Sequence, residues 1–308
     1  MAQDHPHRTT PDRAAPDSTP SGRRDPSPRV PRVLAVAGSD PSGGAGIQAD
    51  LKAVAACGGY GMAVVTALTA QNTRGVTGVH TPPADFVTLQ LDTLQRDVVI
   101  DAVKIGMLAT ADVADRVDRW LGQVDSDPHR PAVVLDPVMV ATSGDRLLDP
   151  PAERAVRALL HRADVVTPNL PELAALLDED VAHDWETALH QASALAERYD
   201  VLVVAKGGHL VDDDVPDALV GPRGVLAQVV APRVRTTATH GTGCSLSSAI
   251  ATRHAVVDDW ALALAQAKEW LTEAIRHGAA LGVGGGHGPV DHFAALRGAL
   301  VAPFHASR

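Results

Sequence analysis

The sequence lacks the features that would assign it to several common classes of protein. Cys57 and Cys244 are the only two cysteines among 308 residues, so a disulfide framework is excluded and a reducing, cytoplasmic location is expected. No apolar run approaches the ~20 residues needed to cross a bilayer, so we expect no membrane association. The pair Arg23 and Arg24 resembles an export signal, but no long apolar segment follows it.

Positive charge and several well-known motifs are also scarce. The formal net charge of −10 argues against a nucleic-acid partner, although backbone N–H groups can still make a site locally positive. Despite 14 histidines there is no HExxH or CxxC spacing, which disfavours a zinc site. The absence of GxGxxG disfavours a dinucleotide-dependent oxidoreductase.

The order of apolar segments predicts one α/β domain. Residues 1–30 are rich in Pro, Asp, Arg, Ser and Thr and predict a disordered tail, and residues 31–300 form the predicted domain. Continuous apolar runs bounded by Gly and Pro are typical of buried parallel strands, and amphipathic stretches follow them. We therefore predict a doubly wound, mostly parallel sheet flanked by helices. The main predicted strands cover 33–38, 62–68, 102–106, 132–138, 163–169 and 201–208, and predicted helices cover 47–58, 85–97 and 260–278.

Six polar or Gly-rich loops follow these strands. Because ligands bind at the carboxyl ends of strands in such sheets, we expect the loops to form one site. The loops are residues 38–46, 71–75, 104–108, 136–139, 167–172 and 206–209.

The loop "GSDPSGGAG" (Gly38–Gly46) connects a predicted strand to a predicted helix. Such a loop can hold a phosphate at a helix N-terminus, but a tight structural turn is an equal alternative. It is not a Walker A motif, because no Lys-Ser or Lys-Thr follows the last glycine. Asp40 is either a substrate ligand or a turn residue.

Two further segments, "DPVM" and "TPNLPE", combine acidic and amide side chains. Asp136, Asn169 and Glu172 suit Mg²⁺, which binds few carboxylates and keeps its waters. A helix N-cap at Asn169 with Glu172 at its third position explains the spacing at least as well. Lys206, in "AKGGH", either pairs with a phosphate or lies at a solvated strand end.

The segment "HGTGCSLSSAIA" places glycines before a helix. Gly241, Thr242 and Gly243 leave the first N–H groups of that helix open, which predicts an anion hole. Cys244 lies at the positive end of the helix dipole, where we expect the pKa of its thiol to fall. The alternative is a small buried cysteine in a structural turn.

Taken together, the motifs resemble one known family. "AVAGSDPSGGAGIQADLKAV", "VTALTAQNTRGV", "VKIGMLAT", "VLDPVMVATSGDRLL", "TPNLPELAALL", "VVAKGGHL" and "THGTGCSLSSAIA" resemble the hydroxymethylpyrimidine/phosphomethylpyrimidine kinases of the ribokinase superfamily. The resemblance runs from about Val33 to His292. It implies a ribokinase-like fold, ATP and Mg²⁺ as cofactors, a small pyrimidine as substrate and a homodimer.

The resemblance also implies roles for individual residues. It puts the first Gly-rich loop on the pyrimidine side, Cys244 at the position where many sugar kinases have an aspartate base, and the anion hole at Gly241–Gly243. On the pyrimidine side it implies Gln71, Asp40, Gly38, Met107, Gly43, Gly44 and Gly46. On the ATP and Mg²⁺ side it implies Lys206, Thr167, Asn169, Asp136 and Glu172.

The expected reaction is phosphorylation of 4-amino-5-hydroxymethyl-2-methylpyrimidine and then of its monophosphate. For the second step we expect the N–H groups of Gly43–Gly46 to bind the acceptor's phosphate. A pyridoxal kinase on the same fold and a non-catalytic pyrimidine sensor are the alternatives.

Overall fold

The structure is a computed structural model that describes residues 29–126, 128–139 and 150–301. The predicted disordered tail lies outside these residues except for Arg29 and Val30. The part of the "VLDPVMVATSGDRLL" motif after Met139 also lies outside them. Within the described ranges no helix is both long and apolar enough to cross a bilayer.

Nine strands of the described residues form a single sheet in the order β3-β2-β1-β4-β5-β6-β7-β8-β9. Neighbouring strands from β2 to β7 pair in parallel, and the pairs β2–β3, β7–β8 and β8–β9 are antiparallel. The prediction of a mostly parallel sheet is confirmed. The strands are β1 (Arg32–Ser39), β2 (Tyr60–Asn72), β3 (Gly75–His80), β4 (Ala102–Ile105), β5 (Ala132–Leu135), β6 (Val165–Val166), β7 (Leu202–Lys206), β8 (Asp214–Gly221) and β9 (Gly224–Pro232).

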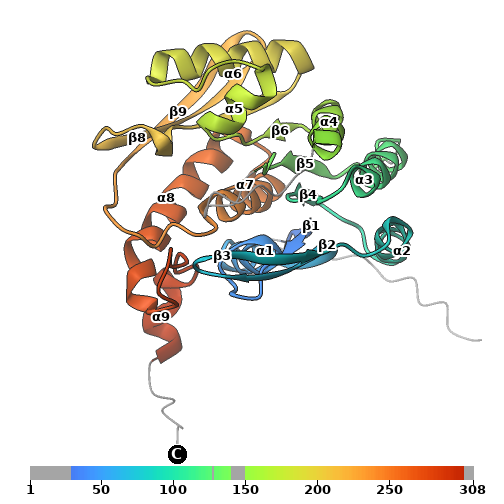
Figure 1. Cartoon of the computed structure of the whole chain (residues 1–308), viewed down its shortest axis with the longest axis horizontal. Helices are drawn as coiled ribbons and strands as arrows, with labels where there is room; N and C mark the ends of the chain where they lie inside the picture. Colours follow the sequence, from blue (N-terminus) through green and yellow to red (C-terminus); the bar gives the residue numbers. More distant parts are fainter. Residues whose placement is uncertain (1–28, 127, 140–149, 302–308) are drawn as a thin grey trace, which may run out of the picture.

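Helices cover both faces of the sheet (Figure 1). One core lies between the sheet and α2 to α6, and a second lies between the sheet and α1, α7 and α8. The α-helices are α1 (Gly46–Ala56), α2 (Ala84–Gln95), α3 (Ala111–Val124), α4 (Pro150–Leu159), α5 (Leu170–Leu177), α6 (Trp185–Tyr199), α7 (Thr242–Val257), α8 (Trp260–Gly278) and α9 (Ala294–Val301). Short 3₁₀ turns occur at Leu160–Arg162, Gly207–His209 and Ala279–Leu281.

The parallel strands set the position of the site. Ile105 pairs with Leu135, and Leu135 pairs with Val166, so β4, β5 and β6 end at one edge of the sheet. Helix α7 packs against β4 and β5 and begins at the same edge. The loops after the strands and the N-terminus of α7 therefore meet there, as the βαβ pattern predicts.

Candidate active site

A cavity of about 960 Å³ occupies this edge of the sheet. It collects most of the residues singled out from the sequence, but Gly43, Gly44 and Thr167 do not line it. The predicted site residues that line it are Gly38, Asp40, Gly46, Gln71, Met107, Asp136, Asn169, Glu172, Lys206, Gly241, Thr242, Gly243 and Cys244.

The carboxylate of Asp40 organises the first Gly-rich loop. It accepts hydrogen bonds from the backbone N–H of Ser42 (2.8 Å), of Gly44 (3.2 Å) and of Ala45 (2.8 Å). The N–H of Gly43 donates to the Asp40 carbonyl at 2.9 Å. The prediction that Gly43–Gly46 donate to a phosphate is therefore wrong for Gly43, Gly44 and Ala45, because their N–H groups are already engaged within the loop.

The first loop is locked to the loop before α7. His240 Nε2 donates to Asp40 Oδ2 over 2.8 Å, and both side chains are buried. A Cβ on Gly241, whose φ is +77°, would lie 1.8 Å from the Gly44 carbonyl oxygen, so the two backbones touch. Burial alone would raise the pKa of Asp40, but hydrogen bonds led by that from His240 lower it to about 2.

On the expected pyrimidine side, Met107 forms part of the cavity wall and Gln71 contributes a side-chain amide. A Cβ on Gly38 would lie 3.1 Å from the Met107 methyl group, so the glycine leaves the Met107 side chain room at the cavity wall. Thr69 Oγ1 donates to the Ser39 carbonyl oxygen at 2.8 Å and lies 3.2 Å from the side-chain amide of Gln71, which lines the cavity.

Asp136 and Lys206 form the charged centre of the cavity. Lys206 Nζ lies 3.2 Å from Asp136 Oδ1, and the same oxygen accepts from Thr167 Oγ1 at 3.0 Å. Thr167 thus acts on Asp136 and not on the cavity, which corrects its predicted place beside ATP. Burial opposes the charge of Asp136, yet Lys206 and then Lys104 hold its pKa below the ordinary value.

The residues Asn169 and Glu172 form a complete capping box. The Glu172 N–H donates to Asn169 Oδ1 (2.9 Å), and the Asn169 N–H donates to Glu172 Oε2 (2.8 Å). The capping interpretation of this spacing is confirmed, and both residues also line the cavity. Burial raises the pKa of Glu172 to about 7, although Lys206 opposes this.

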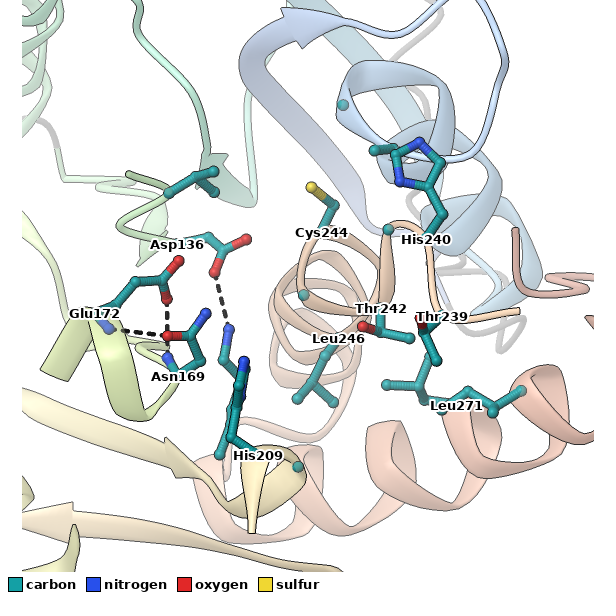
Figure 2. Close-up of a pocket in the computed structure, with 18 of the residues that line it drawn as sticks. Asp136, Asn169, Glu172, His209, Thr239, His240, Thr242, Cys244, Leu246 and Leu271 are labelled. Atoms are coloured by element: carbon teal, nitrogen blue, oxygen red, sulfur yellow. Dashed lines mark hydrogen bonds and ion pairs between the residues drawn. The ribbon is translucent and has the colours of Figure 1, made fainter. Parts of the chain in front are cut away.

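The N-terminus of α7 opens onto the same charged centre. Gly241 is the N-cap, and a Cβ on Gly243 would lie 3.5 Å from Lys206 Nζ and 3.6 Å from Asp136 Oδ2. The N–H groups of Gly243 and Cys244 belong to the first turn, where no helical acceptor is available. Figure 2 shows Asp136 between Glu172 on one side and the Cys244 thiol on the other.

The thiol of Cys244 departs from the expected chemistry. Burial raises its pKa to about 11, and the opposing influence of Lys104 is smaller. The prediction of a lowered pKa is therefore wrong, because loss of solvation outweighs the helix dipole at this position. The residue is nonetheless partly accessible from the cavity.

Two buried ion pairs at the cavity were missed in the sequence. Lys104 pairs with Asp50 at 2.8 Å, and Lys268 of α8 pairs with Asp217 of β8 at 2.7 Å. Lys104 was detectable, because a lysine within the apolar strand "AVKIG" needs a buried partner. No sequence pattern indicated that side chains of β8, β9 and α8 also line the cavity. They are Val215, Asp217, Ala231, Pro232, Lys268, Leu271, Thr272 and Ile275.

The acidic side chains of the cavity suit Mg²⁺ if substrate phosphates complete its coordination. The described residues contain no group of three His, Cys, Asp or Glu side chains that could hold a metal on its own. Asp136 Oδ2 is buried and has no hydrogen-bond partner among the described residues, which leaves it available to a cation. One or two carboxylates completed by substrate phosphates are the usual environment of Mg²⁺, so the residues fit.

Comparison with known proteins identifies the family. The sequence model of the family described as Phosphomethylpyrimidine kinase matches residues 40–291. The chain belongs to this family. The hydroxymethylpyrimidine/phosphomethylpyrimidine kinase of Escherichia coli is 48% identical over 85% of this chain and 97% of its own length. The thiamine biosynthesis multifunctional protein ThiED of Corynebacterium efficiens is 54% identical over 88% of this chain, which spans only 36% of that larger protein.

Solved structures of family members and of related kinases share the fold. A phosphomethylpyrimidine kinase from Clostridium difficile superposes with a TM-score of 0.68 and 34% identity, covering 80% of this chain and all of the other. A pyridoxal kinase from Staphylococcus aureus, solved with AMP-PCP and pyridoxal, gives a TM-score of 0.77 at 30% identity over 87% of this chain and 96% of its own. The predicted ribokinase-like fold is confirmed.

Proposed function

We propose that this protein is an ATP-dependent kinase of 4-amino-5-hydroxymethyl-2-methylpyrimidine and of its monophosphate. One observation carries the proposal: the groups expected to bind phosphate, the Cys244 thiol and the groups expected to bind the pyrimidine all line a single cavity, which we therefore describe by a phosphate end and a pyrimidine end. Lys206 and the N-terminus of α7 form the first end. Gln71 and Met107 mark the second.

The charged end has the groups that phosphoryl transfer requires. Lys206 and the first N–H groups of α7 bind the phosphates of ATP and neutralise charge that builds up during transfer. Asp136, with Glu172 beside it, holds Mg²⁺, which when bound supplies further neutralisation of phosphate charge. Thr167 and Lys206 keep the Asp136 carboxylate in place.

The pyrimidine end presents the hydroxymethyl group to Cys244. Gln71 offers an amide to the aminopyrimidine edge, and the wall formed by Gly38 and Met107 contacts the ring. The Cys244 thiol orients the substrate hydroxyl and accepts its proton when the thiol is ionised. Since phosphoryl transfer depends mainly on positioning and charge neutralisation, a weakly populated base suffices.

An assay of ADP release with a panel of alcohols tests the proposal. The expected result is rapid ADP formation with the hydroxymethylpyrimidine and slow formation with pyridoxal. Preference for pyridoxal would replace the proposal with the pyridoxal kinase alternative, which the TM-scores of the solved pyridoxal kinases motivate. Substrate binding without ADP release would instead identify a sensor.

Transfer of two phosphates is tested by the products. With excess ATP, mass spectrometry should detect the pyrimidine diphosphate after the monophosphate has formed. Since Gly43 and Gly44 have no free N–H, the acceptor's phosphate must bind elsewhere in the cavity. Accumulation of monophosphate alone by an active enzyme would refute the second step.

We also propose a homodimer and a cytoplasmic location. Exposed apolar side chains on β2, β3 and α2, among them Leu68, Val79 and Phe86, support the dimer. Light scattering at micromolar concentration tests it, and a monomeric mass would contradict it. The two free cysteines support a reducing compartment, which fractionation of the native host would test.

A further inference from the structure

The pair formed by Lys104 and Asp50 is fully buried. Lys104 comes from β4 and Asp50 from α1, the two charges lie 2.8 Å apart, and neither side chain is exposed to solvent. Removing two charges from water costs about as much as their attraction returns, so such a pair is a weak source of stability. The function proposed above does not yet use it.

The pair contacts α7 at Ser248, one helical turn after Cys244. Cys244 and Ser248 are one turn apart on α7, and Gly46 and Asp50 are one turn apart on α1, so the two helices meet through these positions. Ser248 Oγ donates to Asp50 Oδ1 at 2.8 Å, and the Gly46 N–H faces the Cys244 sulfur. Within the part of the chain that the structure describes, Asp50 Oδ2 is buried and has no hydrogen-bond partner.

The ammonium of Lys104 lies in a buried space beside Gly106. A Cβ on Gly106 would lie 2.9 Å from Lys104 Nζ, so the glycine leaves the space that the ammonium occupies. Lys104 and Cys244 both line the cavity. The lysine is therefore within electrostatic range of the thiol in a region with little water to screen it.

We propose that Lys104 is a positioning residue whose buried ammonium makes Cys244 easier to ionise, while Asp50 limits this effect as its counter-charge. The inference rests on the proposed place of Cys244 at the substrate hydroxyl. A lysine acting through a cysteine in this way gives the kinase a usable base without a carboxylate at that position.

Four charged groups from four elements act on the thiol. Lys104 of β4 and Lys206 of β7 favour the thiolate, and Asp50 of α1 and Asp136 after β5 disfavour it. Among these charges Lys104 has the largest influence on the pKa of Cys244. Burial lowers the pKa of Lys104, but Asp50 together with Cys244 and Asp136 more than offsets this, so the lysine stays charged.

The rate of Cys244 alkylation by iodoacetamide across pH 7–9 tests the proposal. The reaction follows the thiolate fraction and needs no substrate, so it is independent of whether the proposed kinase reaction is correct. All variants are made in the Cys57→Ala protein, in which Cys244 is the single thiol. Lys104→Met should slow alkylation about tenfold at fixed pH, and Asp50→Asn should accelerate it about tenfold, which is a shift of about one pH unit each way.

The opposite signs separate electrostatics from structure. Both substitutions break the same ion pair, so a purely structural role would move both rates in the same direction. Shifts in the same direction, or no shift in either variant, would overturn the proposal. Lys268→Met, at the other buried pair of the cavity, is the matched control and should leave alkylation of Cys244 unchanged.

A second comparison covers the case in which Lys104→Met does not fold. Replacing both members of a buried pair is often tolerated better than removing one. Alkylation should therefore be compared between Asp50→Asn and the Asp50→Asn/Lys104→Met double variant, which differ only at position 104. The lysine-containing protein should react about tenfold faster or more at equal pH, and equal rates would refute the role of Lys104.

Discussion

Two loops that contain glycines precede helices at this site, and they differ in whether a carboxylate accepts hydrogen bonds from their backbone N–H groups. Gly38–Gly46 leads into α1, and His240–Cys244 leads into α7. In the first loop the Asp40 carboxylate accepts the N–H groups of Gly44 and Ala45. The described part of the second loop has no acceptor of this kind at Gly243 and Cys244, and its helix N-terminus faces Lys206 instead.

The difference shows that glycine content does not by itself make an anion site. An aspartate within the loop satisfies the N–H groups and adds negative charge, so the loop repels a phosphate. A lysine beside a loop with free N–H groups has the opposite effect. We therefore expect the second loop to serve phosphoryl transfer and the first to shape the pyrimidine side and to hold the second in place through His240.

The largest predicted effect is at the second loop. Cys244→Ala should lower kcat about 10²–10⁴-fold, the usual contribution of a general base, because it removes the group that we propose meets the reacting hydroxyl. ATP affinity and melting temperature should change little. Steady-state kinetics with isothermal titration of ATP measure both, and near-normal turnover of the folded variant would refute the assignment.

A substitution beside the first loop should instead affect binding. Gln71→Leu removes the amide that we propose pairs with the aminopyrimidine edge, at an expected cost of about 1–3 kcal/mol, or about 5- to 150-fold in pyrimidine KM. ATP binding should persist. Asn72→Leu at the adjacent exposed position is the control, and an unchanged KM for Gln71→Leu would show that Gln71 faces elsewhere.

The sequence predicted the parallel framework because its apolar runs are buried on both faces. The runs at 33–38, 102–106 and 201–208 became β1, β4 and β7, and the helix predicted at 260–278 became α8 with identical ends. The antiparallel strands β3, β8 and β9 lie at the two sides of the sheet; β3 and β9 have mostly exposed or half-buried side chains, whereas β8 is buried from Asp217 to Gly221. Only tertiary pairing defines them.

The positions of the site loops were likewise predictable, but the hydrogen bonds within them were not. The edge containing Asp136, Lys206 and Gly243 follows from strand direction alone. Whether the N–H of Gly44 is free depends on where the Asp40 carboxylate points, which no spacing reveals. The raised pKa of Cys244 similarly depends on burial by segments distant in the sequence.

The hydrogen bond between His240 and Asp40, which links the two loops, should make the free energy of unfolding depend on pH at low pH. Asp40 has a folded-state pKa of about 2, below its ordinary value of 3.8, so it stabilises the folded protein above pH 4 and this contribution disappears as the pH falls toward 2. The shift corresponds to about 2 kcal/mol. Asp40→Asn should therefore lower the melting temperature at pH 7, and the difference from wild type should shrink as the pH falls below 4. A constant difference across that range would show that the charge of Asp40 is unimportant.

The smallest expected effect is at Glu172, whose carboxylate already accepts a hydrogen bond from the Asn169 N–H. Glu172 caps α5 and also faces the proposed Mg²⁺, so its two roles have to be separated. Glutamine can still accept the Asn169 N–H, and Glu172→Gln should therefore preserve the cap while removing one charge near the metal. We expect the Mg²⁺ concentration for half-maximal activity to rise about tenfold with little change in melting temperature.

Glu172→Ala provides the contrast, because it removes both the charge and the cap. It should show the same increase in Mg²⁺ requirement together with a loss of about 1 kcal/mol of stability, measured by chemical denaturation. The two variants thus separate a metal ligand from a structural cap by a difference in stability at equal metal dependence. If Glu172→Gln behaved as wild type in the Mg²⁺ titration and only Glu172→Ala were impaired, Glu172 would be fully engaged by its own loop, as Asp40 is, and Asp136 alone would hold the cation.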